Sequence, residues 1–183
     1  MHWSKNTVPR AEHEIVTNPR HTVKDCKMSG TMPELHSTYL GELKIEVTGT
    51  YLLGDSPLGR RRLDRLDKGY FRGPKVQAGI VAGGMDLLLG GADGAVRPDV
   101  RLVLELDDGE VLLIIYRGVR HAAPEVMQRI ARGDAVPPSD YYLRTGLVFE
   151  TASKKYDWLN RIVGVGVGRR EPGAVFYDVF EVL

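Results

Sequence analysis

The sequence predicts a mainly β domain, folded as a meander barrel or a sandwich, with one short helix. Residues 99–118 hold two runs rich in Val, Ile and Leu, joined at Asp108-Gly109, a dipeptide that favours a tight hairpin turn in which both residues have positive φ. Apolar and polar residues alternate in several other segments, as they do in half-buried strands. Turn signals recur at spacings of roughly 8–15 residues, which is typical of all-β folds.

Size and composition place the chain among ordinary globular proteins. It has 183 residues, of which 43% are hydrophobic and 27% charged, with a net charge of +1. The small net charge argues against a nucleic-acid binder, which is normally strongly basic. The single cysteine, Cys26, excludes an internal disulfide. No apolar run reaches membrane-spanning length, so we expect a cytoplasmic protein with no membrane and no nucleic-acid partner.

The chain divides near Met32. Residues 1–31 are polar, show no hydrophobic period, and are expected to form a poorly structured extension or an arm against a partner subunit. Residues 32–183 are expected to form one β domain. Besides the hairpin 99–118, the expected strands span residues 39–48, 76–81, 87–89, 142–150, 162–168 and 175–182.

One helix is predicted over residues 124–132. Pro124 suits the first helical position and Gly133 the C-terminal cap. Val126, Met127 and Ile130 form an apolar stripe that must lie against another element, because so short a helix is unstable alone. The helix lies either over the mouth of a barrel, as a lid or plug, or on the outside of the sheet.

Residues 60–65 and 164–168 resemble functional motifs, but neither predicts a binding or catalytic site. Residues 60–65 form a basic cluster interleaved with Asp64, and we interpret them as a solvated loop. Gly164-Val-Gly-Val-Gly168 resembles a dinucleotide loop, yet turn residues follow it where a helix is required. Its alternating glycines are better explained by a strand face that another backbone or a ligand approaches closely. The five histidines are scattered, so we predict no metal site.

Polar residues inside the expected strands are the candidate site. They are Asp86, Arg101, Glu105, Tyr116 and Arg144. If their faces converge in a barrel, Arg–carboxylate pairs would hold a fixed set of donors and acceptors in a dry cavity. Alternatively, they form cross-strand ion pairs on the surface, worth a few tenths of a kcal/mol each.

The sequence resembles the DUF3237 (UPF0311) family over about residues 34–183. The resemblance is carried by segments that occur in the family's order: Gly59-Arg60, Phe71-Arg-Gly-Pro74, Gly83-Gly84-Met-Asp86, Asp99-Val-Arg101, Asp107-Asp108-Gly109, Tyr142-Leu-Arg-Thr145, Phe149-Glu-Thr151, Tyr156-Asp-Trp-Leu-Asn160 and Val175-Phe-Tyr-Asp-Val-Phe-Glu-Val182. It implies a closed antiparallel β-barrel, calycin-like and similar in shape to allene oxide cyclase and dirigent barrels, that is often oligomeric. Leu87 departs from the pattern, which usually has Trp after the aspartate.

With this resemblance, two functions compete. The first is a cofactor-independent enzyme that acts on a small aromatic or hydrophobic molecule by proton transfer, as a lyase, isomerase or cyclase; an aldehyde-releasing elimination on a phenol would suit it. Asp86 would be the general base or would orient one, and Arg101 and Arg144 would stabilise an oxyanion. Tyr116 would relay a proton or donate a hydrogen bond to a phenolic oxygen. The second is a carrier barrel without chemistry.

The ligand contacts follow from the same hypothesis. The substrate-binding candidates are Tyr70, Phe71, Glu105, Tyr142 and Trp158, four of them aromatic and suited to a flat ring. We expect no cofactor, and we expect a homo-oligomer, either a dimer or a trimer.

Overall fold

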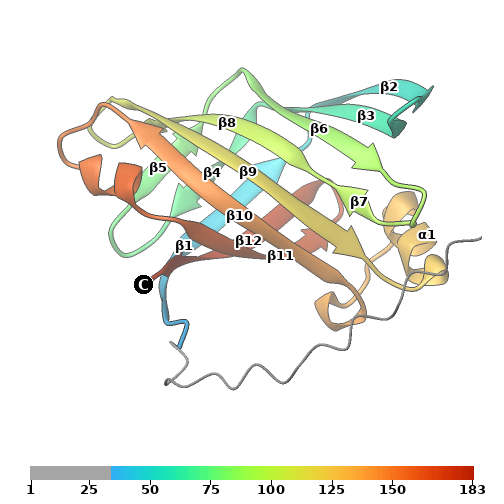
Figure 1. Cartoon of the computed structure of the whole chain (residues 1–183). Coiled ribbons are helices and arrows are strands. Elements are labelled where there is room, and N and C mark those ends of the chain that lie inside the picture. Colours follow the sequence, from blue (N-terminus) through green and yellow to red (C-terminus); the bar gives the residue numbers. More distant parts are fainter. Residues whose placement is uncertain (1–33) are drawn as a thin grey trace, which may run out of the picture. The chain divides into compact units, whose positions relative to one another are not determined.

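The structure, a computed structural model, describes residues 34–183 (Figure 1). The extension predicted over residues 1–31 lies outside the described residues. The strands are β1 (Ser37–Glu46), β2 (Gly49–Ser56), β3 (Gly59–Leu66), β4 (Lys68–Arg72), β5 (Gln77–Ile80), β6 (Gly84–Gly90), β7 (Val96–Arg97), β8 (Asp99–Leu106), β9 (Val111–His121), β10 (Tyr142–Thr151), β11 (Gly164–Glu171) and β12 (Ala174–Val182). The helices are α1 (Pro124–Arg132) and the short 3-10 turns η1 (Pro138–Asp140) and η2 (Asp157–Arg161).

The strands form one antiparallel sheet that closes on itself, as the predicted barrel requires. Neighbouring strands run in the order β10, β11, β12, β1, β4, β5, β8 and β9, and β9 pairs again with β10. The closing pair is long, with a continuous register from Tyr142 opposite His121 to Thr151 opposite Leu112. Closure leaves no free edge in this ring.

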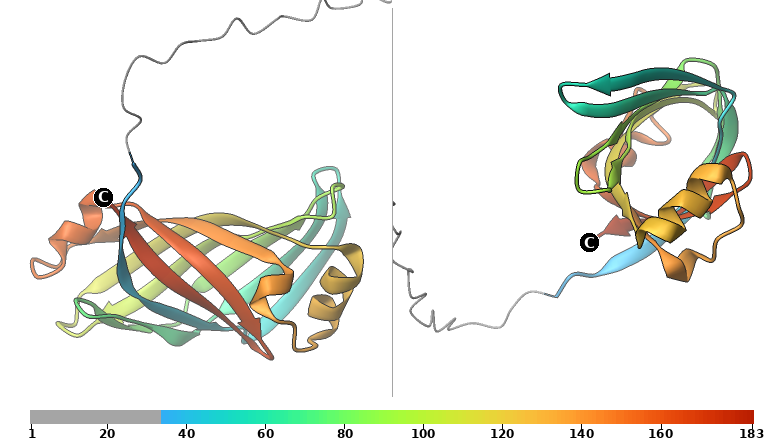
Figure 2. Two further views of the ribbon diagram at one scale, coloured as in Figure 1. Left: turned by 90° about the horizontal axis from the view of Figure 1, so that it is seen from below. Right: turned by 90° about the vertical axis from the view of Figure 1, so that its right-hand side faces the viewer.

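The hairpin β2–β3 leaves the ring. β1 pairs with both β12 and β4, whereas its continuation β2 pairs only with β3, which in turn pairs with β6. Viewed along the barrel, this hairpin stands off from the ring (Figure 2, right). β3 covers residues 60–65, so the predicted solvated loop is wrong: the basic cluster lies on a strand, with Asp64 and Leu66 buried and Arg60 and Arg65 exposed.

One end of the barrel is filled with apolar side chains. Alternate residues of β8 and β9 point inward, and those of lowest exposure include Leu102, Leu104, Leu112 and Ile114. The charged residues of β8 take the opposite face, because side chains alternate along a strand. This half of the barrel is a packed core.

The alternating glycines of β11 make room for side chains of neighbouring strands. A Cβ on Gly168 would lie 2.4 Å from Leu143 Cγ and 2.8 Å from Tyr177 Cε1. A Cβ on Gly166 would lie 2.4 Å from Thr145 Oγ1. The strand face is therefore closely approached, as predicted, but by side chains of β10 and β12 and not by another backbone or a ligand.

The β8–β9 hairpin turns at Asp108-Gly109 as predicted, but by a different turn. Gly109 has a φ of 82°, and no residue other than glycine has a positive φ among residues 34–183. The N–H of Gly109 donates to Leu106 O at 3.0 Å, and the N–H of Leu106 donates to Glu110 O at 2.9 Å. Only one left-handed residue is needed, as in a type I turn followed by a glycine bulge.

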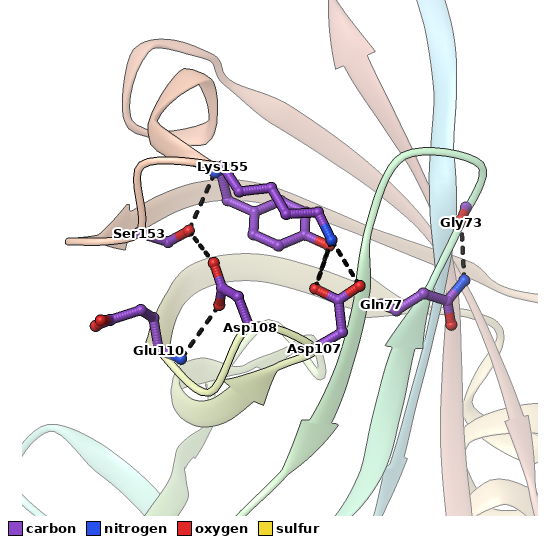
Figure 3. A network of polar contacts seen from close by, with 8 residues as sticks. Gly73, Gln77, Asp107, Asp108, Glu110, Ser153 and Lys155 are labelled. Atoms are coloured by element: carbon purple, nitrogen blue, oxygen red, sulfur yellow. Dashed lines mark hydrogen bonds and ion pairs between the residues drawn. The ribbon is translucent and has the colours of Figure 1, made fainter.

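The far end of the barrel is closed by η2 and a polar network (Figure 3). Asp107 accepts hydrogen bonds from Lys155 Nζ, at 2.7 and 2.8 Å, and from the Tyr156 hydroxyl at 2.7 Å. Ser153, buried with 1% exposure, donates to Asp108 Oδ2 at 2.5 Å and accepts from the Tyr156 N–H at 3.2 Å. These bonds tie the β8–β9 turn to the segment after β10.

The predicted helix is confirmed as α1, and it lies at the opposite end, at the rim of the mouth (Figure 2). Pro124 begins it, and Gly133 caps it with a φ of 83° while its N–H donates to Ile130 O at 3.1 Å. Ile130 and its neighbours on one face pack on the barrel, so of the two placements left open by the sequence the mouth is the one found. Among residues 34–183, no helix is long and apolar enough to span a membrane.

Candidate functional site

A small cavity lies inside the barrel just below the mouth. Its volume is about 30 Å³, which is room for water-sized groups only. Its polar lining comes from five strands: Asp64, Asp86, Tyr116, Arg120, Arg170 and Tyr177. Apolar side chains such as Ile45, Leu66 and Leu143 complete the wall and separate the cavity from the packed half of the barrel.

Two carboxylates face the cavity from adjacent strands. Asp64 on β3 and Asp86 on β6 are directly opposite in register. Asp64 is 3% exposed and accepts a hydrogen bond from the Thr50 hydroxyl at 2.7 Å and another from Arg62 Nη2 at 2.7 Å. Its charge is therefore compensated within the protein.

Asp86 is less well compensated. Its one hydrogen bond comes from the backbone N–H of Asp99, at 3.2 Å. Burial, assisted by the negative charge of Asp64, raises the pKa of Asp86 to about 6, while that N–H acts in the opposite direction. A carboxyl group with such a pKa takes up and releases a proton readily near neutral pH.

Arg120 on β9 is the main cation of the cavity. It is 9% exposed, its Nε has no hydrogen-bond partner, and no carboxylate among residues 34–183 forms an ion pair with it. Burial, and then the charge of Arg170, lower its pKa to about 10. A buried guanidinium without a partner is unfavourable, so this position suits a ligand that brings a negative charge.

Two phenols complete the polar wall. The rings of Tyr116 and Tyr177 pack edge to face, with centroids 5.3 Å apart. Burial raises the pKa of Tyr116 well above its usual value and that of Tyr177 to about 12. Both hydroxyls therefore stay protonated at neutral pH and serve as hydrogen-bond donors.

The cavity opens into a larger hollow at the mouth. This hollow measures about 640 Å³ and lies between the β2–β3 hairpin, β6–β7 and α1. Leu88, Val96, Arg120 and Arg170 line both spaces, so they form the passage from one to the other. Together, the hollow and the cavity form a wide outer chamber with a narrow polar inner end.

Of the predicted catalytic residues, the structure brings two into this cavity. Asp86 and Tyr116 line it together, on β6 and β9. Arg101 and Arg144 do not, and the expectation that they converge with Asp86 is wrong. Both follow inward-facing residues by one position, so they point outward: Arg101 pairs with Asp99 at 2.9 Å, and the Arg144 guanidinium lies 5.1 Å from the Tyr142 ring centroid.

None of the five predicted substrate contacts lines the cavity. Phe71 is fully buried in the packed half, stacked on Phe149 with centroids 6.2 Å apart. Tyr70 lies on the outer surface, where its hydroxyl donates to Glu42 Oε1 at 2.7 Å. Glu105 and Tyr142 are exposed, and Trp158 belongs to η2 at the far end. These five residues miss the cavity either because their side chains alternate to the outer face of a strand or because they lie at the end of the barrel away from the mouth.

The functional candidates that the sequence analysis missed are Asp64, Arg120, Arg170 and Tyr177. The alternation of side chains along a strand could have identified Arg120, because it lies four residues after Tyr116 on the same strand and therefore on the same face. Asp64 was hidden in the basic cluster, and only the β3–β6 register places it opposite Asp86. Among residues 34–183, no group of three His, Cys, Asp or Glu side chains is placed to hold a metal ion.

A closed antiparallel β-barrel with a polar cavity under its mouth is the class of protein that this fold and site define. The chain belongs to the DUF3237 family, described as a protein of unknown function, whose model matches residues 35–182. A UPF0311 protein of Clostridium acetobutylicum is 29% identical over 150 residues, covering 81% of this chain and 95% of that protein.

A solved structure and an enzyme are also similar. The crystal structure of a conserved protein of unknown function from Rhodopseudomonas palustris has a TM-score of 0.79 at 26% identity, covering 83% of this chain and 100% of that one. A hydroalkoxylation enzyme of Penicillium herquei is 28% identical over 116 residues, covering 63% of this chain and 62% of the enzyme.

Proposed function

We propose that this protein is an enzyme that catalyses proton transfer on a small aromatic or hydrophobic molecule, with Asp86 as the general base. The observation that carries the proposal is one carboxyl group with a pKa of about 6, in a cavity that also holds an unpaired buried guanidinium and two protonated phenols. A base near neutral pKa beside preorganised donors is the arrangement that acid–base catalysis requires.

The proposed chemistry needs no net oxidation or reduction. The Asp86 carboxylate removes a proton from an acidic O–H or C–H bond of the substrate, and the electron pair left behind is delocalised onto a substrate oxygen. The Arg120 guanidinium and the hydroxyls of Tyr116 and Tyr177 stabilise that oxyanion. Asp86 then returns the proton to a different atom. The roles first given to Arg101 and Arg144 pass to Arg120.

Addition of an alcohol across a double bond fits the same steps. The base takes the hydroxyl proton, the oxygen attacks a carbon–carbon double bond conjugated to a carbonyl, and the resulting enolate accepts the proton at carbon. Every atom of the substrate is kept in the product. The likeness to a hydroalkoxylation enzyme supports this reaction class, and the elimination or isomerisation of a phenolic substrate would use the same base.

The size of the cavity constrains how a substrate would bind. About 30 Å³ admits a single oxygen or a small group, whereas the hollow of about 640 Å³ is in the range of small-molecule sites. The ring would therefore stay in the outer hollow while the reacting atoms enter the cavity.

Exchange of substrate hydrogen with solvent deuterium is the most direct test. The protein is incubated in deuterated buffer with a panel of phenols that carry a side-chain hydroxyl and a conjugated double bond, and products are followed by mass spectrometry. We expect the wild type to incorporate deuterium or form an isomer, and Asp86→Asn to be at least roughly 100-fold slower. Arg161→Gln, a surface change at the far end, serves as the matched control.

The carrier hypothesis predicts a different outcome. Binding of a panel member without exchange or product, at any pH between 5 and 9, would contradict the enzyme proposal and leave a ligand-binding barrel. Retention of full turnover by Asp86→Asn would contradict the role given to Asp86.

A homo-oligomer and a cytoplasmic location remain predictions. β2 pairs on one side only, and Tyr51, Leu52, Leu53 and Leu58 of its hairpin are exposed. We propose that this free edge pairs with a second copy of the chain, because an apolar strand edge is otherwise prone to aggregation. Light scattering should give a dimer for the wild type and a monomer for Leu53→Glu, and a monomeric wild type would contradict the proposal.

A further inference from the structure

The hollow at the mouth is lined by arginines and by no acidic residue. Six arginines border it: Arg60, Arg61, Arg62, Arg120, Arg132 and Arg170. The whole chain carries 25 basic and 24 acidic residues, so this concentration is local. Charges of one sign in a concave surface reinforce one another and attract counter-ions of the opposite sign.

Only two of the six are neutralised within the protein. Arg62 pairs with Asp64 at 2.7 Å, and Arg132 pairs with Asp134 at 2.8 Å. Within residues 34–183, no ion pair involves the other four, Arg60, Arg61, Arg120 and Arg170. Arg61 instead donates to the backbone oxygen of Leu87 at 3.2 Å. The hollow therefore contains an uncompensated positive charge.

Part of this positive charge lies inside the barrel, on Arg120. It is 9% exposed, its Nε lacks a partner, and Arg170 and Arg62 are near enough to lower its pKa further. Like charges near a buried guanidinium disfavour its charged form, and a bound anion would relieve this cost. Guanidinium groups bind carboxylates and phosphates in a bidentate manner.

The rest of the lining is apolar. Leu52, Leu88, Val96, Ile130 and Ala131 cover the hollow on the sides of the hairpin, β6–β7 and α1. A site of this kind matches a ligand that has both an apolar body and an anionic group.

We propose that the hollow binds the anionic group of an amphipathic organic acid, held by Arg60 and Arg170, while its apolar body contacts Leu88, Val96 and Ile130. This inference names the substrate class of the proposed active site and rests on that function only for the claim that the bound acid is turned over. Arg170 lines both spaces, so it would hold the ligand at the entrance to the cavity.

Equilibrium dialysis with three matched naphthalene compounds tests the proposal. The probes are 2-naphthoate, its neutral methyl ester, and 2-naphthyl phosphate, each at pH 7.5. We expect 2-naphthoate or 2-naphthyl phosphate to bind at least tenfold more tightly than the ester, and the tighter of the two identifies the anion as carboxylate or phosphate. The affinity of that anion should fall between 50 and 500 mM salt.

Variants place the binding at the mouth. Arg60→Gln removes an exposed side chain, so it is expected to fold, and it should weaken anion binding; adding Arg170→Gln should bring the loss to at least tenfold. Arg161→Gln, with the same charge change at the far end, should bind as the wild type does. Equal affinity for acid and ester, no binding of either anion at millimolar concentration, or unchanged binding by Arg60→Gln with Arg170→Gln would overturn the proposal.

The two proposals fail separately. If Asp86→Asn and the wild type both bind the anion but the wild type turns over no acid, the anion site stands and the enzyme proposal is wrong. If neutral esters are turned over as fast as their acids, the enzyme proposal stands and the anion site is wrong.

Discussion

Asp64 and Asp86 lie opposite each other in the register of β3 and β6, and both face the same cavity. Their surroundings differ. Asp64 receives hydrogen bonds from Thr50 and Arg62, whereas Asp86 receives one backbone N–H and is raised in pKa to about 6. Of the two carboxyl groups, Asp86 is therefore the one suited to act as a general base near neutral pH.

Asp86→Asn is expected to stabilise the fold at neutral and alkaline pH. The pKa of Asp86 is about 6 in the folded protein against an ordinary value of 3.8, so ionisation opposes folding. The stability contributed by the protonated group is fully present below about pH 4 and is lost as the pH rises through 6. Since one pKa unit corresponds to 1.36 kcal/mol, the variant should gain roughly 2–3 kcal/mol at pH 8.

Urea unfolding at pH 4 and pH 8 measures this difference. The two proteins should differ little at pH 4, where wild-type Asp86 is protonated, and most at pH 8. A variant less stable than the wild type at pH 8 would show that the Asp86 carboxylate is compensated in the folded state.

Asp64→Asn should shift the pH dependence of turnover. The negative charge of Asp64 is one cause of the raised pKa of Asp86, so its removal lowers that pKa. For the wild type, kcat/KM should rise with pH and level off above about 6, because the base must be ionised. The variant should keep the same shape with its midpoint at lower pH, measured as the rate of deuterium exchange; an unmoved midpoint would argue against Asp86 as the titrating group.

Gly168→Ala should destabilise the barrel, and Gly146→Ala should not. The new Cβ at 168 would meet Leu143 and Tyr177 at 2.4–2.8 Å, whereas nothing lies within 4 Å of a Cβ at 146. Overpacking of this kind typically costs about 1–3 kcal/mol. Thermal unfolding of the two variants compares them directly, and equal melting temperatures would mean that the side chains of Leu143 and Tyr177 both move aside freely.

Ser153→Ala should weaken the fold without changing turnover. The substitution removes the hydroxyl that accepts the Tyr156 N–H and donates to Asp108 at the far end (Figure 3). Leaving a buried donor without a partner costs about 1–3 kcal/mol. Denaturant unfolding should show the loss, while kcat/KM on any substrate stays at the wild-type value. A change in kcat/KM would indicate that the two ends of the barrel are coupled.

The β-barrel could be predicted from the sequence because the signals for its strands, turns and helix are local and recur along the chain. Strand alternation, turn glycines and Pro124 with Gly133 each predict an element from its own residues, and closure followed from the family resemblance. Parity along β8 also separated Leu102 and Leu104 from Arg101 correctly, but it did not say which face was the interior.

The site depended on registers that no single segment encodes. Asp64 and Asp86 meet only because β3 pairs with β6, and Arg120 and Arg170 reach the same passage from β9 and β11. The sequence analysis chose Arg101 and Arg144 because they are polar residues in strands that the sequence predicts clearly. Their neighbours along each strand fill the core, so the two arginines point outward. A basic cluster that looked solvated was instead the wall of the mouth.

The β2–β3 hairpin borders the ligand hollow yet takes no part in closing the barrel. Through β3 the hairpin also pairs with β6, the strand that carries Asp86. A change in the hairpin therefore alters both the lining of the hollow and the surroundings of the base.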